Sequence, residues 1–269
     1  MELQVYYQPM INLSSGKIGC FEALLRWHHP TKKNVSPIEF IPIAEDTGLI
    51  VPLGYWVLKE AIAQTKKWQK QFSHDYKNLI ISVNLSARQV LEPCLLSKIE
   101  QLLQQFDFKP ECLKLEVTES LLMENFDSAL EVFLQLERLG VGLAIDDFGT
   151  GYSSLARIQT LPVRVIKIDR SFIKNIEQSE SNLELVRGIV ALGSKLGKKV
   201  IVEGVETESQ LKIMQDLGAD EGQGYYFTRP LNANLAQALL DKKPQWEFWQ
   251  QDKNAKQRLL QMHRADLMT

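Results

Sequence analysis

The stretch Ala144-Ile145-Asp146-Asp147-Phe148-Gly149-Thr150-Gly151 places two adjacent carboxylates at the end of an apolar run. The run, Val141 to Ile145, predicts a buried strand, and the two glycines that follow predict a loop. Two neighbouring charges at the end of a buried strand repel each other and are costly to desolvate unless a cation or a hydrogen-bond donor lies beside them. Asp and Gly also form turns, so the stretch alone fits either a turn or a site.

Apolar runs of strand length recur along the chain and alternate with segments of helical pattern. We expect eight strands, near residues 3–10, 18–27, 79–84, 113–117, 141–145, 163–168, 199–202 and 223–227. Helical segments are expected after the second to eighth strands, including 36–46, 51–72, 93–106, 127–139, 183–196, 207–217 and 232–240. This alternation predicts a mainly parallel sheet, and eight strands without a split favour a closed β/α barrel over an open doubly wound sheet.

The first connection, residues 12–17, is too short for a parallel crossover, which needs about a dozen residues or more. The first two strands should therefore be antiparallel, with Gln8 opposite Phe21 or Glu22. The predicted fold is α/β, a modified TIM-type (β/α)8 barrel with an antiparallel first strand, over residues 1–243. Residues 244–269 are polar with scattered aromatic side chains, and we expect a C-terminal helical tail or linker there. Of these, we favour a helix that docks on the barrel.

The bulk composition narrows the function. The 269 residues carry a formal charge of −2, which argues against non-specific binding to duplex nucleic acid. Three cysteines without close spacing argue for a reducing compartment and against a zinc cluster or a disulfide framework. No signal peptide or membrane span is visible. The chain begins almost inside its first strand, so we expect a domain of a longer protein.

Polar side chains gather at the predicted carboxyl ends of the strands, which meet at one mouth of a barrel of this type. Each of these residues taken alone is most simply structural. Together they place many carboxylates in one cavity with few cations, and such a set needs metal to offset its charge. Oxygen ligands without Cys or His favour Mg²⁺ or Mn²⁺. The residues are Gln8, Glu22, Arg26, Asn84, Glu116, Glu119, Asp146, Asp147, Lys167, Asp169, Glu203, Glu206 and Gln223.

Two reaction classes fit oxygen-ligated metal and one lysine in a barrel. In the first, Lys167 acts as a base that abstracts a proton next to a carboxylate, while metal holds the enolate. In the second, two metals assist hydrolysis of a phosphodiester. The adjacent pair Asp146-Asp147 favours the second class because it can bridge two ions.

The segment Glu22-Ala23-Leu24-Leu25-Arg26 resembles the signature of EAL domains, the bacterial cyclic di-GMP phosphodiesterases. The resemblance covers about residues 3 to 243. It includes Tyr7-Gln8-Pro9 before this segment. After it, the resemblance continues through Ser82-Val83-Asn84-Leu85-Ser86, Glu116-Val117-Thr118-Glu119, Asp146 to Ser153, Lys167 to Phe172, Glu203-Gly204-Val205-Glu206 and Gln223-Gly224-Tyr225. A single short motif would mean little, whereas eight motifs in order are specific.

The resemblance implies hydrolysis of cyclic di-GMP to linear pGpG, with Mg²⁺ or Mn²⁺ as two ions in each site. It assigns the first ion to Glu22, Asn84, Glu116 and Asp146, and the second to Asp146, Asp147 and Glu203. Lys167 would position the attacking water, so that Glu22, Asp146, Lys167 and Glu203 carry the catalysis. Arg26, Gln8, Gln223 and Asp169 would contact the nucleotide.

The resemblance also implies regulation. Glu119 and Glu206 would lie behind the metal ligands, with Glu119 anchoring the loop at 148–156, and this loop would contribute to a homodimer. A sensory or GGDEF domain is the expected covalent partner, and the cytoplasm is the expected location. The alternative is a receptor that binds cyclic di-GMP without cleaving it. Family members of that kind usually lack one or more metal-ligating residues or the signature itself, whereas here each of these positions carries the expected residue.

Overall fold

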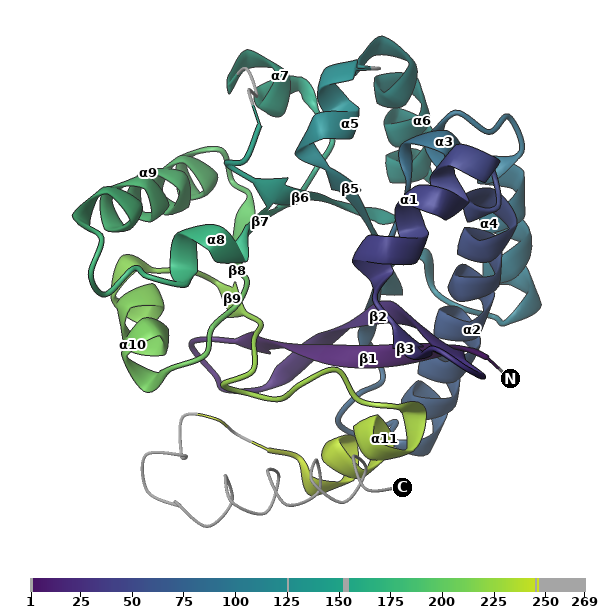
Figure 1. The fold of residues 1–269 in the computed structure, drawn as a ribbon, viewed down its shortest axis with the longest axis horizontal. Coiled ribbons are helices and arrows are strands. Elements are labelled where there is room, and N and C mark those ends of the chain that lie inside the picture. Colours follow the sequence, from purple (N-terminus) through teal and green to yellow (C-terminus); the bar gives the residue numbers. More distant parts are fainter. Residues whose placement is uncertain (1, 125, 152–154, 245, 247–269) are drawn as a thin grey trace.

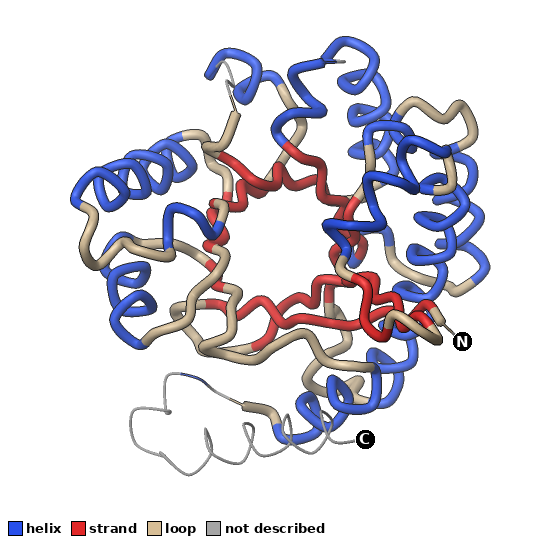
Figure 2. Tube along the Cα trace, in the orientation of Figure 1, coloured by secondary structure: helices blue, strands red, loops and turns tan. Residues whose placement is uncertain are grey.

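A ring of strands forms the centre of the molecule. The computed structural model describes residues 2–124, 126–151, 155–244 and 246. Its sheet has the order β1-β9-β8-β7-β6-β5-β4-β2-β3, and pairing of β1 with β2 closes it, leaving β3 as a short hairpin partner outside the ring (Figure 2). The strands are β1 (Leu3–Asn12), β2 (Ile18–His29), β3 (Lys33–Val35), β4 (Ile80–Asn84), β5 (Leu113–Thr118), β6 (Gly142–Phe148), β7 (Val165–Ile168), β8 (Lys199–Val202) and β9 (Glu221–Gly222).

Helices surround this ring (Figure 1). They are α1 (Pro37–Thr47), α2 (Ile50–Gln71), α3 (Ala87–Val90), α4 (Leu95–Gln105), the 3₁₀ helix η1 (Pro110–Cys112), α5 (Glu119–Glu124), α6 (Phe126–Leu139), α7 (Leu155–Thr160), α8 (Arg170–Ile173), α9 (Glu180–Lys195), α10 (Glu208–Leu217) and α11 (Ala233–Lys242). The closed ring confirms the predicted barrel and rules out the open doubly wound sheet.

The antiparallel start of the barrel is confirmed residue by residue. In the pairing of β1 with β2, Gln8 lies opposite Glu22, one of the two partners that the short connection predicts. β1 is also antiparallel to β9. The other neighbouring strands of the ring, β2 with β4 and then each strand with the next up to β9, are parallel. The early Gln8 therefore enters the same layer of side chains as residues that come much later in the chain.

The last predicted strand is wrong. β9 is only Glu221–Gly222, and the residues expected in it, 223–227, form a turn in which the amides of Phe227 and Thr228 donate to Gly224 O. The turn packs closely on the loop that follows β8, and a Cβ on Gly224 would lie 2.1 Å from Val205 O. This close approach needs glycine and is not visible in an apolar, aromatic run. The strand β3 and the short helices α3, α5, α7 and α8 were not predicted either.

Side chains inside the barrel form two layers because residues two apart on a strand point the same way. The lower layer holds an apolar cluster of Met10, Cys20, Ala144, Val165 and Ile201. Two residues further along the parallel strands, toward their carboxyl ends, the same face carries Glu22, Asp146, Lys167 and Glu203. The apolar layer and the charged layer are therefore adjacent, two residues apart along each strand.

The outer core fixes the position of this mouth. Trp68 of α2 is fully buried and packs edge-on against Tyr7, with ring centroids 4.8 Å apart, and against Phe21 at 5.4 Å. Full burial of an aromatic side chain of this size stabilises the fold by about 3 kcal/mol. Beyond α11, Trp246 is buried and its amide donates to Gly16 O. The helix expected over the rest of 245–269 lies outside the described residues.

Among the described residues, no helix combines the length and the apolar character needed to cross a membrane.

Candidate functional site

Lys167 lies at the centre of the charged mouth and has no exposed surface. Its Nζ atom is 2.6 Å from Glu116 Oε2 and 2.6 Å from Glu203 Oε1. It is also 3.1 Å from Asp146 Oδ1 and 3.7 Å from Glu22 Oε2. The carboxylates come from four different strands or strand ends, which the closed barrel brings to one mouth, and there all four lie around one ammonium group.

The carboxylates form two groups of potential metal ligands. Each group offers oxygen atoms that all lie within 4.8 Å of one another: Glu22, Glu116 and Asp146 form the first, and Asp146, Asp147 and Glu203 form the second. Asp146 belongs to both. A single lysine leaves these five carboxylates, which are buried or partly buried, with an excess of negative charge, and oxygen donors suit hard divalent cations. The donor set therefore fits a metal-binding site.

The pKa values of these groups follow from burial and crowding. Burial raises the pKa of Glu116 to about 7, although Lys167 opposes the shift. Burial likewise raises the pKa of Glu203 well above its usual range, again against the effect of Lys167. Burial and the adjacent Asp146 raise the pKa of Asp147 to about 6. Burial alone would lower the pKa of Lys167, but the carboxylates around it raise that pKa well above its usual range.

Hydrogen bonds hold the first group of ligands in place. Asn84 Nδ2 donates to Glu22 Oε1 at 2.8 Å, and Gln223 Nε2 donates to Glu22 Oε2 at 2.6 Å. Gln223 Nε2 also donates to Gln8 Oε1 at 3.1 Å, which connects the turn after β9 to β1. Both oxygens of the Glu22 carboxylate are thus oriented from two sides.

Ser82 is a site residue that the sequence reasoning missed. Its hydroxyl donates to Glu116 Oε1 at 2.5 Å, and the side chain is fully buried. Ser82 lies two residues before Asn84 on β4, so the period of the strand points both side chains into the barrel. That spacing was the available signal, but a serine within an apolar strand resembles ordinary core.

The loop after Asp146 has a constrained backbone. Asp147 has φ of 54° and Gly149 has φ of 99°, both in the left-handed region. A Cβ on Gly149 would lie 2.9 Å from the Phe172 ring, so glycine is required there for space as well. Buried Glu119 accepts hydrogen bonds through Oε2 from the amides of Gly149 at 2.9 Å and Gly151 at 3.2 Å.

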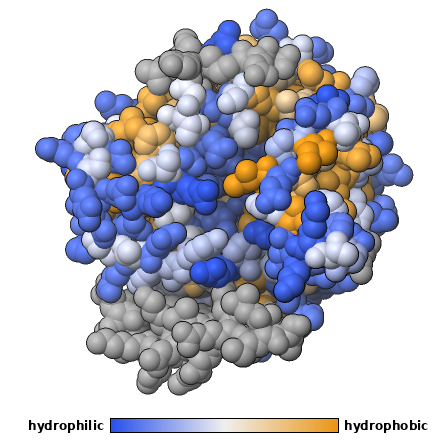
Figure 3. All heavy atoms as spheres, in the orientation of Figure 1, coloured by the Kyte–Doolittle hydropathy of each residue, from blue (hydrophilic) through white to orange (hydrophobic). Residues whose placement is uncertain are grey.

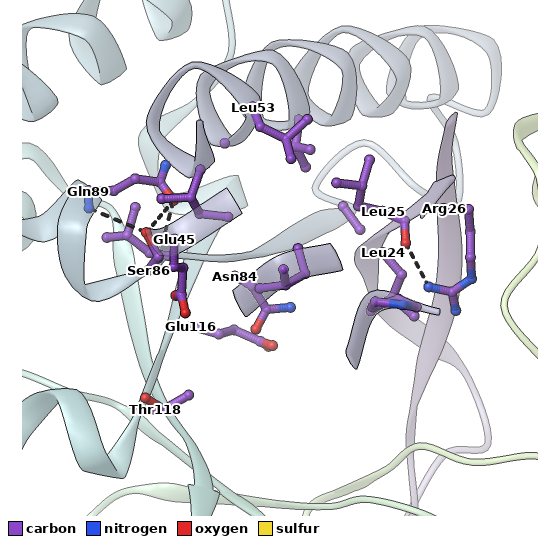
Figure 4. A pocket seen from close by; sticks show the side chains of 17 residues that line it. Leu24, Leu25, Arg26, Glu45, Leu53, Asn84, Ser86, Gln89, Glu116 and Thr118 are labelled. Carbon is purple, nitrogen blue, oxygen red and sulfur yellow. Dashed lines mark hydrogen bonds between the residues drawn. The ribbon is translucent and has the colours of Figure 1, made fainter. Parts of the chain in front are cut away.

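The remaining predicted residues lie further out. Arg26 is partly buried, donates to Leu25 O at 2.9 Å, and lines a cavity of about 280 Å³ whose wall includes Asn84 and Glu116 (Figure 4). Asp169 caps α8, accepting from the Ser171 amide at 3.0 Å. Glu206 is exposed, and its carboxylate makes no hydrogen bond or ion pair with the part of the chain that the structure describes.

The residues expected at a dimer contact fall only partly within the described structure. Residues 148–151 are described, whereas 152–154 are not, so this expectation stays untested.

Comparison with known proteins places this site in a family. The EAL domain profile matches residues 1–230. The chain is 46% identical over 242 residues to the uncharacterized protein y4lL of Sinorhizobium fredii, covering 90% of this chain and 28% of that protein. It is 42% identical over 232 residues to the bifunctional diguanylate cyclase/cyclic di-GMP phosphodiesterase MucR of Pseudomonas aeruginosa, covering 86% of this chain and 33% of that protein.

Among solved structures, the PaMucR phosphodiesterase in complex with c-di-GMP superimposes with a TM-score of 0.83 at 42% identity. The match covers 87% of this chain and 94% of that chain. By contrast, the chain spans about a third of the length of the curated relatives it matches. The profile match, the identities and the shared barrel agree, and the chain belongs to the EAL domain family.

Proposed function

We propose that this domain hydrolyses cyclic di-GMP to linear pGpG. The observation that carries the proposal is the pair of carboxylate groups that share Asp146 around the buried Lys167. Relatives named as cyclic di-GMP phosphodiesterases, and the c-di-GMP complex of a similar barrel, support the choice of substrate. An adjacent carboxylate pair that can bridge two ions favours phosphodiester hydrolysis over enolate chemistry.

Two divalent ions, Mg²⁺ or Mn²⁺, are the proposed cofactors. Glu22, Asn84, Glu116 and Asp146 would hold one ion, and Asp146, Asp147 and Glu203 the other. When bound, such ions lower the pKa of water and offset the charge that develops on the phosphate oxygens. The hydrogen bonds from Asn84 and Gln223 to Glu22 would keep that carboxylate oriented for its ion.

Lys167 would hold and orient the attacking water once divalent ions share the neutralisation of the carboxylates. Its ammonium group already lies within 2.6 to 3.7 Å of four of the five acidic ligands, which puts it between the two groups. In the hydrolysis, the oxygen of water bonds to phosphorus, the bond from phosphorus to the 3′ oxygen breaks, and a proton passes to that oxygen. Glu22, Asp146, Lys167 and Glu203 are therefore the residues to which we assign the catalysis.

The substrate would lie across the mouth beside Arg26, whose planar guanidinium suits phosphate oxygens. Gln8, Gln223 and Asp169 would contribute further contacts to the nucleotide. The cavity in Figure 4 has apolar walls with a few polar groups, a combination that suits a purine base. Figure 3 shows hydrophilic side chains around the central hollow, with a hydrophobic patch at its rim over α1.

Regulation would act through the loop held by Glu119. A homodimer contact near 148–156 would couple the geometry of that loop to metal binding. A linked sensory or GGDEF domain is proposed because the relatives are about three times as long as this chain. We assign the activity to the cytoplasm, where such signalling domains would meet their nucleotide.

Conversion of cyclic di-GMP to pGpG in the presence of Mg²⁺ or Mn²⁺, followed by chromatography, tests the proposal. We expect turnover that stops when a chelator is added and returns when metal is restored. Tight binding of cyclic di-GMP without any pGpG would instead identify the domain as a receptor.

A further inference from the structure

Ser82 lies behind the metal-binding carboxylates rather than among them. In the pairing of the strands it stands on β4 between Glu22 of β2 and Lys114 of β5. Its side chain is fully buried, and its hydroxyl donates to Glu116 Oε1 at 2.5 Å. Neither group of potential metal ligands includes Ser82, and the proposed mechanism gives it no role. An effect of this hydroxyl on the metal site must therefore pass through Glu116.

The two oxygens of the Glu116 carboxylate have different surroundings. Oε2 accepts from Lys167 Nζ at 2.6 Å, and the same ammonium group contacts three further carboxylates, so Oε2 faces the other ligands. Oε1 is bonded to Ser82. Because the Glu116 side chain has no exposed surface, solvent does not compete for Oε1. One oxygen is thus turned toward the metal site, and the other is held by β4.

Glu22 is held in a similar way, but by residues that have other tasks. Its two oxygens accept from Asn84 and Gln223. Asn84 is itself a proposed metal ligand and Gln223 a proposed contact of the nucleotide, so replacing either changes several properties at once. Within the described part of the chain, the Ser82 side chain makes a single hydrogen bond, the one to Glu116. Ser82 therefore isolates the effect of holding one carboxylate oxygen.

A carboxylate with one oxygen engaged can offer a metal ion only the other. Mg²⁺ demands a near-octahedral set of oxygens at short distance, whereas Ca²⁺ accepts a larger and looser set of about six to eight oxygens and often binds both oxygens of one carboxylate. Restricting Glu116 to Oε2 removes a contact that only the larger ion uses. The serine hydroxyl does this without adding a charge, so it repels neither ion.

We propose that Ser82 determines the metal selectivity of this site: by holding Oε1 of Glu116 it limits that carboxylate to one bond with a metal ion, which favours Mg²⁺ over Ca²⁺. The inference rests on the proposed function, because it concerns the ion assigned to Glu22, Asn84, Glu116 and Asp146. Ser82 is a positioning residue, since it acts through Glu116 and touches neither the ion nor the nucleotide. Excluding an ion of looser coordination protects a reaction in which water and phosphate must be aligned.

Metal binding in the absence of nucleotide tests the proposal. Calorimetry gives the Kd of Mg²⁺ and of Ca²⁺ for the wild type, Ser82→Ala and Ser82→Thr. Removing a hydrogen bond behind a metal ligand costs about 10- to 100-fold in affinity. We therefore expect Ser82→Ala to weaken Mg²⁺ binding about tenfold, while Ca²⁺ binds as tightly as before or more tightly because Oε1 becomes free. Ser82→Thr keeps the hydroxyl and should restore the wild-type ratio of the two Kd values.

Thr65→Val is the matched control. It removes another fully buried hydroxyl, on α2, which has no hydrogen-bond partner in the described structure, so both Kd values should stay as in the wild type. A purely structural role of Ser82 would weaken the binding of both ions equally. A ratio of Kd values in Ser82→Ala within about twofold of the wild-type ratio would thus overturn the proposal, whatever the loss of overall affinity.

Infrared difference spectra supply a readout that does not depend on how well threonine fits the core. The separation of the symmetric and antisymmetric carboxylate bands distinguishes coordination through one oxygen from coordination through two. Adding Ca²⁺ to Ser82→Ala should produce an additional two-oxygen band that the wild type lacks. Identical carboxylate bands in the two proteins would contradict the proposal.

Formation of pGpG from cyclic di-GMP in Mg²⁺, measured on the same preparations, reports on the proposed function separately. If the Kd ratio shifts in Ser82→Ala but the wild type forms no pGpG, the proposed function fails and the role of Ser82 stands. If the wild type turns over and the ratio does not shift, the role of Ser82 alone fails. Binding of neither ion to the wild type would overturn both.

Discussion

Lys167 Nζ lies 2.6 Å from Glu116 Oε2 in a part of the barrel where both side chains are closed off from solvent. The same ammonium group contacts three further carboxylates, so it is the one cation among the described residues within 4.0 Å of this acidic cluster. The charge balance of the site, and hence the stability of the metal-free protein, should depend on this residue.

Replacing Lys167 by Met should remove that cation while keeping most of the volume. Breaking a buried ion pair by removing one partner costs about 3–5 kcal/mol. Burial raises the pKa values of the Glu116 and Glu203 carboxyl groups, so these two groups destabilise the folded state as they ionise, between the usual pKa and the raised one. The deficit of Lys167→Met should therefore be largest above pH 7 and shrink as the pH falls toward 5. Urea unfolding across this range measures it; a deficit that does not depend on pH would contradict the charge argument.

Removing the charge of Asp147 should stabilise the metal-free protein, whereas removing that of Lys167 destabilises it, and it should weaken metal binding. Its pKa is raised to about 6, so in the metal-free protein its ionisation lowers stability as the pH rises from about 4 to 6. Asp147→Asn keeps a residue type that tolerates the positive φ but removes the charge. At pH 7 this variant should be more stable than the wild type by about 1 kcal/mol, a modest figure because the carboxyl is only half-buried.

Adding Mg²⁺ should reverse that order, because only the wild type retains the full second ligand group. Thermal unfolding at pH 4.5 and pH 7, with and without Mg²⁺, provides the comparison. Equal Tm values for both proteins at pH 7 without metal would show that the ionised Asp147 carboxylate does not destabilise the folded state.

Glu119 should control the loop that follows the metal ligands. Glu119→Ala removes the acceptor of two hydrogen bonds, from the Gly149 and Gly151 amides, and a hydrogen bond to a charged group contributes about 1.5–3 kcal/mol. We expect faster hydrogen exchange at these two amides and weaker metal binding, with the barrel intact. Glu206→Ala is the control, since that carboxylate is exposed and makes no hydrogen bond or ion pair with described residues. If both variants bound metal as the wild type does, the loop would not be coupled to the site.

The sequence was sufficient to predict the barrel and the gathering of acidic side chains at its mouth for one physical reason. Side chains at the ends of parallel strands converge, so residues such as Asn84 and Glu203 could be grouped without knowledge of any distance. The short connection after β1 also fixed the direction of the first strand, and with it the place of Gln8 beside Glu22.

What the sequence could not predict depends on tertiary contact. The apolar run from Gln223 to Phe227 has the composition of a strand, but its close packing on Val205 makes it a turn. Ser82 resembles a core residue until its hydroxyl is seen against Glu116. Asp169 sits beside other site motifs, yet its carboxylate caps α8, and its role toward the nucleotide stays a prediction.

Asp146 is the most direct test of the proposed mechanism, because it alone belongs to both groups of ligands. Asp146→Asn keeps an oxygen that can accept from the Asp147 amide, so the local fold should persist. The decisive measurement is the rate of pGpG formation from cyclic di-GMP by the wild type and this variant at saturating Mg²⁺. We predict a loss of at least about a thousandfold, as expected for a ligand shared by two catalytic ions. A variant rate within about tenfold of the wild type would contradict the shared-ligand mechanism.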